Sequence, residues 1–391
     1  MSEEKLVPKL RFSGFDDEWK TYKLKDLLHN KSSSISINQL DDNVGNYPLY
    51  GASGFLKCID FYEMDSDYIS IVKDGSGVGN ISFHEKNTSV VNTSQYILPK
   101  ENLNIHFIFY LLQTINLNKY KTGSTIPHIY FKDYSIEKVK IPKYDEQKKI
   151  GILLKNLDAK IEILDNKLQM CQNFKKYLMQ QIFTQKLRFN FTDEWEKYLL
   201  GDISLIGKGF TPSTSNPSFW DGDLKWLSIA DMNQGKYINQ TTKKITSDGS
   251  KNKEPVKKGT LLMSFKLSIG KLGILTEDMY TNEAICNFKW KNKDVLTEYM
   301  YYYLSSINIL KYGSQAAKGI TLNNETLSTI PVLLPSLEEQ KKIINILSDV
   351  DMKINMLENS INDTLKFKKG LLQQMFVVQL ILSLLQHKKH I

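Results

Sequence analysis

The chain has 391 residues, which is room for about two to three domains. Its 41% hydrophobic and 24% charged residues are typical of a soluble globular protein, and no apolar run approaches the ~20 residues of a membrane span. The formal net charge of +8 is a mild indication of an anionic partner such as nucleic acid.

The three cysteines, Cys58, Cys171 and Cys286, lie far apart and have no spacing suited to zinc. We expect three buried free thiols in a reducing cytoplasm. The opening MSEEKLVPKL lacks the apolar core of a signal peptide, so no export is expected.

The first elements follow a short segment, KLRFSGFDDEW, at Lys9–Trp19. After it, the alternating runs YISIVK, NISFHE and SQYILP predict β-strands, and FIFYLL predicts a short helix. The stretches between these runs are rich in Gly, Ser, Asn and Thr, which indicates loops. We therefore predict an α/β insert between Lys9–Trp19 and the next long segment.

That long segment, Pro142–Phe183, carries apolar residues in steps of three and four from Ile150 to Ile182. Such spacing is typical of a helix with one apolar stripe. A helix of about 38 residues would be ~57 Å long at 1.5 Å per residue. A stripe of this length needs a partner helix.

The same order then recurs. KLRFNFTDEW at Lys186–Trp195 repeats the opening segment, KWLSIADM, TLLMSFK and KLGILTE predict strands, and YMYYYL predicts a helix. A second long segment, Pro335–Phe376, matches Pro142–Phe183 without gaps at 19 of 42 positions. The two inserts match only faintly. We call the four repeated segments the frame, and we infer that the frame does one job twice while the inserts do different jobs.

The predicted fold class is therefore two α/β (α+β) domains separated by two long antiparallel coiled-coil helices, with an internal pseudo-two-fold repeat. Two independent helical linkers are the alternative. We place the first frame segment and insert at 1–146, the first helix at 147–185, the second frame segment and insert at 186–339, the second helix at 340–380, and a divergent tail at 381–391. The residues from Val377 onward do not echo TQKLRFNF, so they extend the helix, contact a partner or form a divergent end.

A search for catalytic residues gives none. KDGSGVGN at Lys73–Asn80 lacks the spacing of a nucleotide-binding loop and is better explained as a turn between two strands. NPSF at Asn216–Phe219 is similar to the NPPF tetrapeptide of adenine methyltransferases, but Ser218 replaces the second proline. The six histidines form no metal-binding cluster, and His128 is either polar lining of a surface or an ordinary strand residue. We predict a binding protein with no catalytic or metal site.

The whole layout resembles the specificity (S) subunit of type I restriction–modification systems. The resemblance rests on PKLRFSGFDDEWKTYKLKDL, YPLYGASGF, GNISFHE, VVNTSQYILP, GSTIPHI, KLRFNFTDEWEKYLLGDI, FWDGDLKWLSIADM and the doubled P…EQKKI helices. It covers the chain to Phe376, and the doubled combination is more specific than any one motif.

The resemblance implies two target recognition domains, each of which reads one half of an asymmetric bipartite site in double-stranded DNA. It implies that the helices act as a fixed spacer and that the frame docks two methyltransferase (M) subunits. It also implies that two restriction (R) subunits join the complex. This chain would be a non-catalytic subunit without cofactors in the bacterial cytoplasm, while S-adenosylmethionine, ATP and Mg are expected in the partner subunits.

Both arginines of the chain, Arg11 and Arg188, lie in the frame, so arginine is not available for base contacts in the inserts. We place these arginines in the frame, where they support the core or the docked partner, and Trp19 and Trp195 in the core. Lysine, amide and hydroxyl side chains of the insert loops are then the candidate base or phosphate contacts. In the first insert they are Lys73, Ser76, Asn80, Thr93, Gln95, Lys121, Ser124 and Thr125. In the second they are Lys208, Thr211, Ser213, Lys266, Ser268, Lys271, Gln315 and Lys318.

Three other functions compete with this interpretation. The chain could serve a system that fuses methylation and cleavage in one partner, which only the partner's sequence would reveal. It could be a coiled-coil scaffold whose inserts bind proteins; such a scaffold would show no DNA sequence preference. A free-standing enzyme would need a catalytic constellation that the sequence does not display.

Overall fold

The computed structural model describes residues 8–40, 42–266, 268–316 and 319–376. The chain forms two compact units: unit 1 takes the residues up to 166 and from 358 onward, and unit 2 takes residues 167–357. Each unit therefore contains one insert and a part of each long helix. The mixed α/β class predicted from the sequence is confirmed. The tail 377–391 lies outside the described residues.

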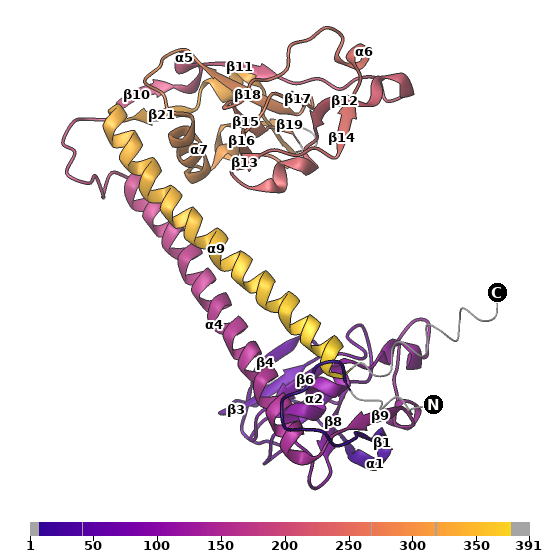
Figure 1. Cartoon of the computed structure of the whole chain (residues 1–391). Helices are drawn as coiled ribbons and strands as arrows, with labels where there is room; N and C mark the ends of the chain where they lie inside the picture. Colours follow the sequence, from indigo (N-terminus) through magenta and orange to yellow (C-terminus); the bar gives the residue numbers. More distant parts are fainter. Residues whose placement is uncertain (1–7, 41, 267, 317–318, 377–391) are drawn as a thin grey trace. The chain divides into compact units, whose positions relative to one another are not determined.

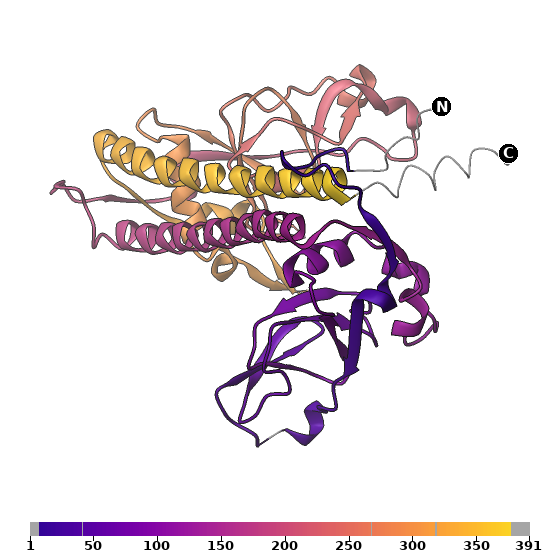
Figure 2. The ribbon, with the colours of Figure 1, turned by 60° about the horizontal axis from the view of Figure 1, so that its bottom comes forward.

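The two long segments are helices of 40 residues each, α4 (Tyr144–Phe183) and α9 (Leu337–Phe376). In unit 1 the start of α4 shares a core with the end of α9, through Ile150, Leu154, Leu371 and Met375. In unit 2 the end of α4 shares a core with the start of α9, through Leu178, Ile182, Ile343 and Leu347. Within each unit the two segments therefore lie side by side and run in opposite directions (Figures 1 and 2).

A polar contact accompanies each of these helix pairs. In unit 1, Lys368 Nζ of α9 lies 2.5 Å from Asp158 Oδ1 of α4. In unit 2, Lys175 Nζ of α4 lies 2.6 Å from Asp351 Oδ1 of α9. These four residues occupy equivalent positions of the repeat. The repeat is thus visible in the contacts within each unit as well as in the sequence.

The first insert folds into two sheets. The larger has the order β2-β8-β5-β6, formed by Leu28–Ser32, Ser94–Pro99, Tyr68–Val72 and Ile81–His84. The smaller has the order β4-β3-β7, formed by Gly54–Ile59, Tyr47–Gly51 and Ser89–Val90. Helix α2 (Ile105–Gln113) buries Phe107, Ile108, Leu111 and Leu112 in the core that also contains Ile69 and Ile71 of β5.

The second insert repeats this arrangement. Its larger sheet has the order β11-β18-β15-β16-β13, formed by Ser204–Lys208, Ile285–Trp290, Leu261–Ser264, Leu272–Leu275 and Tyr237–Ile238. Its smaller sheet has the order β14-β12-β17, formed by Lys243–Ile245, Trp220–Leu227 and Tyr280–Thr281. Helix α7 (Thr297–Ser306) corresponds to α2 and packs against β15 and β16. The first four strands of the larger sheet follow the same order as in unit 1.

Short elements complete the described fold. The short helices are α1 (Leu24–Leu27), α3 (Phe131–Tyr134), α5 (Leu200–Ile203), α6 (Ser247–Ser250) and α8 (Asn324–Ser328). Strand β19 (Ser314–Ala316) pairs antiparallel with β20 (Gly319–Thr321). The strand predicted for KWLSIADM ends at Leu227, because Asp231 accepts hydrogen bonds from the backbone and hydroxyl of Ser228 and so stabilises a turn.

Each opening segment of the frame pairs with the strand that precedes a long helix. In unit 1, β1 (Lys20–Lys23) is antiparallel to β9 (Lys138–Ile141). In unit 2, β10 (Glu196–Leu199) is antiparallel to β21 (Pro331–Leu334). These strand pairs hold the two ends of each insert together, although the paired strands are more than 100 residues apart in the sequence.

The two arginines explain the glutamate of the EQKKI motif. Arg11 donates from Nε and Nη2 to the Glu146 carboxylate at 2.9 and 2.7 Å. Arg188 makes the same two bonds to Glu339 at 2.8 and 2.9 Å. Both carboxylates are buried, and a planar guanidinium fork matches a buried carboxylate better than lysine does. Of the two roles expected for the arginines, these contacts show support of the frame.

The glutamine of the same motif fixes the start of the short helix. Gln147 Oε1 accepts from the backbone N–H of Asn104, the N-cap of α2, at 3.0 Å. Gln340 Oε1 accepts from the backbone N–H of Leu296, the N-cap of α7, also at 3.0 Å. One turn of each long helix therefore holds both the opening segment and the insert helix.

The opening segment contacts the end of a long helix in both units. In unit 2 that segment follows the helix directly in the chain, whereas in unit 1 it comes from the start of the chain. In unit 2, the backbone N–H of Leu187, the residue equivalent to Leu10, donates to Gln181 O at 3.1 Å. In unit 1, Leu10 N donates to Gln374 O at 3.2 Å, although the two residues lie at opposite ends of the described chain. Gln181 and Gln374 are equivalent in the repeat. The end of α9 thus contacts the first opening segment in unit 1 as the end of α4 contacts the second opening segment in unit 2.

The expected burial holds for both tryptophans and for one cysteine. Trp19 and Trp195 are 6% and 5% exposed. Cys286 is buried, whereas Cys58 and Cys171 are half-buried, so the prediction of three buried thiols is wrong for these two. Cys171 lies on α4 and Cys58 on β4, where one side of the element remains partly open.

Candidate nucleic-acid interface

In unit 1, three loops meet at the end of β5. The backbone N–H of Lys73 donates to Thr93 O at 2.8 Å, which joins the turn after β5 to the turn before β8. Ile129 N donates to Lys73 O at 2.9 Å, and Gly75 N donates to Pro127 O at 3.0 Å. The loop that contains GSTIPHI is thereby fixed to the other two, although it follows them by about 30 to 50 residues in the sequence.

A hydrogen bond connects the same loops through their side chains. His128 Nδ1 lies 2.7 Å from Asp74 Oδ1, with each side chain about one-third exposed. The ring of His128 stacks with that of Tyr130, with centroids 6.4 Å apart. His128 thus belongs to a polar surface and forms only isolated bridges, not a strand, which decides between the two sequence interpretations. The role of Asp74 had no signal in the sequence.

Most of the candidates in unit 1 gather at this junction. Ser76, Asn80, Lys121, Ser124 and Thr125 are exposed, and Lys73 and Thr93 are half-buried. A Cβ on Gly79 would lie 3.6 Å from Lys121 Cε, so the stem of Lys121 passes beside the turn that carries Asn80. The KDGSGVGN stretch is a turn between β5 and β6, as predicted.

Gln95 does not belong to this surface. It is 3% exposed, and its Nε2 donates to the Tyr134 hydroxyl at 2.9 Å inside the core. Strand β8 lies between β2 and β5 and is buried from Ser94 to Ile97, so alternation along it does not mark a solvent face. The prediction that Gln95 contacts DNA is therefore withdrawn.

In unit 2, the corresponding strand ends surround a groove of about 380 Å³. Lys208 at the end of β11 and Lys266 after β15 both line it, together with Glu283 from the turn before β18. Its remaining lining residues are Phe265, Leu322, Asn323, Asn324 and Glu325. Two cationic side chains and several amide and carboxylate groups therefore converge on one concave surface.

A chain of hydrogen bonds holds one carboxylate of this groove. The Thr211 hydroxyl donates to Glu283 Oε2 and accepts from Asn282 Nδ2 at 2.9 Å. The Asn282 Oδ1 accepts from the backbone N–H of Ala284 at 2.8 Å, which fixes the amide orientation. Thr211 was a sequence candidate, whereas Glu283 and Asn282 were missed.

The remaining candidates of unit 2 have other partners. Ser213 shares a hydrogen bond of 2.8 Å with Ser215, and Lys271 Nζ donates to Asn233 Oδ1 at 2.7 Å. Ser268 is exposed, and its carbonyl accepts from the Ser264 hydroxyl. Gln315 lies on β19 without a described side chain, and Lys318 lies outside the described residues. Of the predicted contacts, Lys208 and Lys266 line the groove, and Thr211 is hydrogen-bonded to Glu283, which also lines it.

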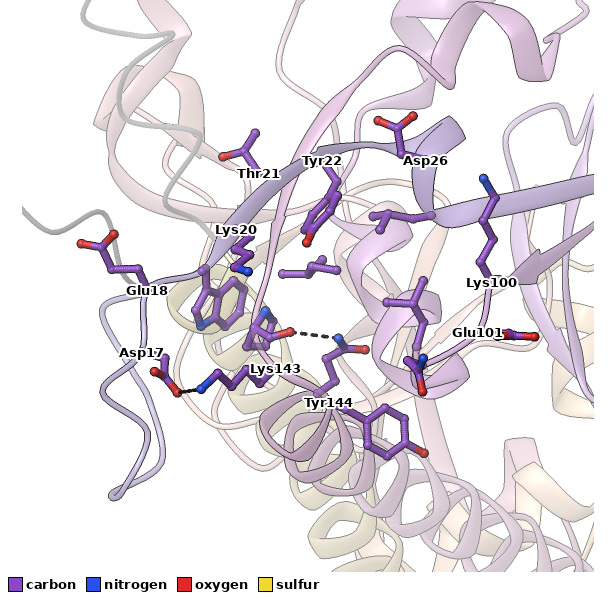
Figure 3. A pocket seen from close by; sticks show the side chains of 17 residues that line it. Asp17, Glu18, Lys20, Thr21, Tyr22, Asp26, Lys100, Glu101, Lys143 and Tyr144 are labelled. Atoms are coloured by element: carbon purple, nitrogen blue, oxygen red, sulfur yellow. Dashed lines mark hydrogen bonds and ion pairs between the residues drawn. The ribbon is translucent and has the colours of Figure 1, made fainter.

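A larger hollow of about 870 Å³ lies on the frame of unit 1 (Figure 3). It is lined by β1, by the turn at 100–103 and by the start of α4. Lys143 Nζ lies 2.8 Å from Asp17 Oδ2 at its edge. None of the predicted DNA contacts lines this hollow, so it is separate from the loops that meet at β5.

Within the described ranges, no group of three or more His, Cys, Asp or Glu side chains is arranged to hold a metal ion. The helices of that part of the chain include none that is long and apolar enough to cross a membrane.

Comparison with known proteins gives the family. A family model described as the type I restriction modification DNA specificity domain matches the chain twice, over residues 16–171 and 192–366. The chain is 23% identical to the type I restriction enzyme MjaVIII specificity subunit of Methanocaldococcus jannaschii, over 91% of each chain. A 30% match to the MjaIX specificity subunit of the same organism spans 42% of this chain and 39% of that one.

Solved structures share the fold. The S subunit of a type I restriction–modification system from M. genitalium superimposes with a TM-score of 0.69 at 16% identity, over 95% of this chain and 99% of that one. A chain solved in work on complex assembly of the type I R-M system gives a TM-score of 0.56 at 14% identity, over 92% and 98%. Since the two family matches cover both inserts and most of each long helix, the chain belongs to the specificity subunits of type I restriction–modification systems.

Proposed function

We propose that this chain reads an asymmetric bipartite site in double-stranded DNA, with one half-site per unit. The observation that carries the proposal is the pair of loop clusters at equivalent strand ends. Both lie where β5 or β15 ends and β8 or β18 begins, yet one presents His128 and Lys73 and the other presents Glu283, Lys208 and Lys266. A common scaffold with different reading groups suits two different half-sites.

The side chains of these clusters suit base and phosphate contacts. Lysine donates to guanine or neutralises phosphate, amides pair with adenine, and carboxylates accept from cytosine. Arg11 and Arg188 are both occupied by buried carboxylates of the frame. Base reading would thus rest on lysine, amide, hydroxyl, histidine and carboxylate groups of the loops.

We further propose that α4 and α9 form an antiparallel coiled coil with pseudo-two-fold symmetry, which sets the distance between half-sites. Forty residues correspond to roughly 60 Å of helix at 1.5 Å per residue. That is more than one turn of DNA, roughly 34–36 Å. A rigid spacer of this kind favours a split target with an unread middle.

Exposed apolar side chains at equivalent helix positions support the docking of two methyltransferase subunits. Phe174 and Phe367 are 54% and 58% exposed, and Ile163 and Met356 are 55% and 58% exposed. Large apolar side chains in water favour a partner that covers them, and their duplication favours two copies of one partner. Restriction subunits would join through that assembly, and S-adenosylmethionine, ATP and Mg would be bound there, in the cytoplasm where the DNA lies.

The test is methylome sequencing of DNA from cells that carry this chain with its methyltransferase partner. We expect methyladenine at one split, asymmetric motif that disappears when this chain alone is deleted. A partner shown to be active without any motif that depends on this chain would contradict the proposal and favour a protein scaffold. A partner sequence that contains a nuclease domain would instead identify a fused methylase–nuclease system.

A further inference from the structure

The Glu283 carboxylate is an unusual group to find in a DNA-facing groove. Phosphates repel carboxylates, so an acidic side chain that lines the same groove as Lys208 and Lys266 weakens attraction for the DNA backbone. Such a group favours binding only where it accepts a hydrogen bond from a base. We propose that Glu283 is a specificity-determining residue of unit 2 that accepts from the exocyclic amino group of a cytosine. This inference rests on the proposed function.

Backbone contacts around Gly209 place Thr211 next to the Glu283 carboxylate. Gly209 N and Phe210 N donate to Ile285 O and Thr281 O at 3.1 and 2.8 Å, which brings Thr211 beside Asn282–Glu283. A Cβ on Gly209 would lie 2.0 Å from Thr281 O, so only glycine permits this approach. The position of Thr211 is thus set by backbone contacts that do not involve its own side chain.

The direction of the hydrogen bonds follows from that arrangement. Because Asn282 Oδ1 accepts from Ala284 N, its Nδ2 is the atom that faces Thr211. The Thr211 hydroxyl accepts that bond and therefore directs its own proton to Glu283 Oε2. Of the described residues, Thr211 is the hydrogen-bond partner that the structure gives to this carboxylate. Among the described residues, no other donor bonds to its remaining lone pairs, which can accept from a ligand.

Cytosine is the base whose major-groove edge fits a held carboxylate. It presents the N4 amino donor without a neighbouring acceptor, whereas adenine places N7 beside its amino group. Guanine and thymine present acceptors that would repel the carboxylate, so Glu283 would select by rejection as well as by attraction. Lys208 and Lys266 line the same groove and would bind the flanking phosphates.

Unit 1 differs at the corresponding position. In the faint match of VVNTSQY to YTNEAIC, Asn92 aligns with Asn282 and Thr93 aligns with Glu283. Unit 1 thus has a neutral hydroxyl where unit 2 has a carboxylate. The proposed cytosine contact therefore belongs to one half-site only, which makes the other half-site an internal reference in the test.

The experiment uses the full chain with its methyltransferase partner and compares wild type, Glu283→Gln and Glu254→Gln by methylome sequencing. Glu254 is an exposed carboxylate of unit 2 that does not line the groove, so it matches the charge change. We expect Glu283→Gln to relax discrimination at one cytosine of one half-site by roughly 5- to 150-fold, with the other half-site unchanged. We expect Glu254→Gln to keep the wild-type motif.

An unchanged strict motif in Glu283→Gln at wild-type methylation overturns the inference and leaves the proposed function intact. Thr211→Val is the second variant, because it removes the donor that holds the carboxylate. If Glu283→Gln abolishes methylation, relaxed reading of one cytosine in Thr211→Val supports the inference, and strict reading there overturns it. A wild-type chain that directs no motif fails the proposed function and this inference together.

Discussion

The hydroxyl of Tyr302 lies 2.6 Å from Asp351 Oδ2 and donates a hydrogen bond to it. Tyr302 belongs to α7 of the second insert and Asp351 to α9, so this bond fastens the insert to the helix. In unit 1, Tyr110 of α2 donates to Asp158 of α4 at the same distance. Burial, together with the hydrogen bond to Asp351, raises the pKa of Tyr302 and keeps the hydroxyl protonated as the donor.

Replacing Tyr302 by phenylalanine should lower the free energy of unfolding by about 1.5–3 kcal/mol, because a buried hydrogen bond to a charged group is lost. Urea unfolding of the purified chain measures the change. Tyr301→Phe is the matched control, since the Tyr301 hydroxyl has no hydrogen-bond partner among the described residues. Equal effects of the two variants would contradict a role for the Tyr302–Asp351 bond.

Arg188→Ala should cost about 3–5 kcal/mol of unfolding free energy, because it leaves the Glu339 carboxylate, 1% exposed, without its guanidinium. Arg188→Lys keeps the charge but loses the two-point fork, so it should cost less than alanine yet more than nothing. Chemical denaturation reports both. Lys186→Ala, at an exposed position two residues away, should be near neutral. An Arg188→Ala chain as stable as wild type would be inconsistent with this frame contact.

Binding of the assembled complex to its target should weaken steeply with salt, because lysines release counterions from phosphates. Lys73→Ala or Lys266→Ala should weaken binding and reduce the slope of log affinity against log salt by about 1. Fluorescence anisotropy across a salt series measures this slope. Lys293→Ala, an exposed lysine outside the groove, serves as the control. Unchanged affinity and slope in both variants would remove these lysines from the interface.

The stability of the chain should fall between about pH 6.5 and pH 4 because of His84. Burial lowers the pKa of His84 from 6.5 to about 4, so below pH 6.5 the unfolded chain binds a proton that the folded chain does not. The loss amounts to about 3 kcal/mol at 1.36 kcal/mol per pKa unit. His84→Gln, which can still bond to Ser70, should flatten this part of the pH profile in urea unfolding. Parallel profiles for wild type and variant would show that His84 does not contribute.

Lengthening both helices should lengthen the unread spacer of the DNA target. Seven residues inserted after Asn166 and after the equivalent Asn359 add two turns, roughly 10.5 Å or three base pairs, and preserve the apolar stripe. Methylome sequencing reads the new spacing directly. Insertion in α4 alone should abolish methylation, since the two stripes then lose register. An unchanged spacing after the double insertion would refute the fixed-spacer model.

Periodic features of the fold were predictable from the sequence. The stripe from Ile150 to Ile182 and its copy predict α4 and α9, and the alternation in YISIVK predicts β5. Alternation was misleading at Gln95, because β8 is buried over the stretch that contains it. Alternation of polar and apolar residues marks the solvent-exposed face of a strand only where one face is exposed, so it fails where both faces are covered.

The arrangement of the loops was much less predictable. Asp74 and His128 are 54 residues apart, and Thr211 and Glu283 are 72 apart. Each pair depends on backbone hydrogen bonds between loops that have no period of their own. The composition of the inserts indicated lysine, hydroxyl and amide groups as DNA contacts. The hydrogen bonds of Glu283 with Thr211 and of His128 with Asp74 became visible only in the folded structure.

The two helix contacts described above are reciprocal between the copies of the repeat. Asp158 of the first copy pairs with Lys368 of the second, and Asp351 of the second copy pairs with Lys175 of the first. Reversing the charge of Asp158 would therefore leave Lys368 of the other copy facing a like charge, and the same holds for Asp351 and Lys175. A substitution at one of these helix positions therefore requires a matching change in the other copy, whereas the insert loops are not tied to each other in this way. Such mutual constraint accounts for a frame that still matches itself and inserts that scarcely do.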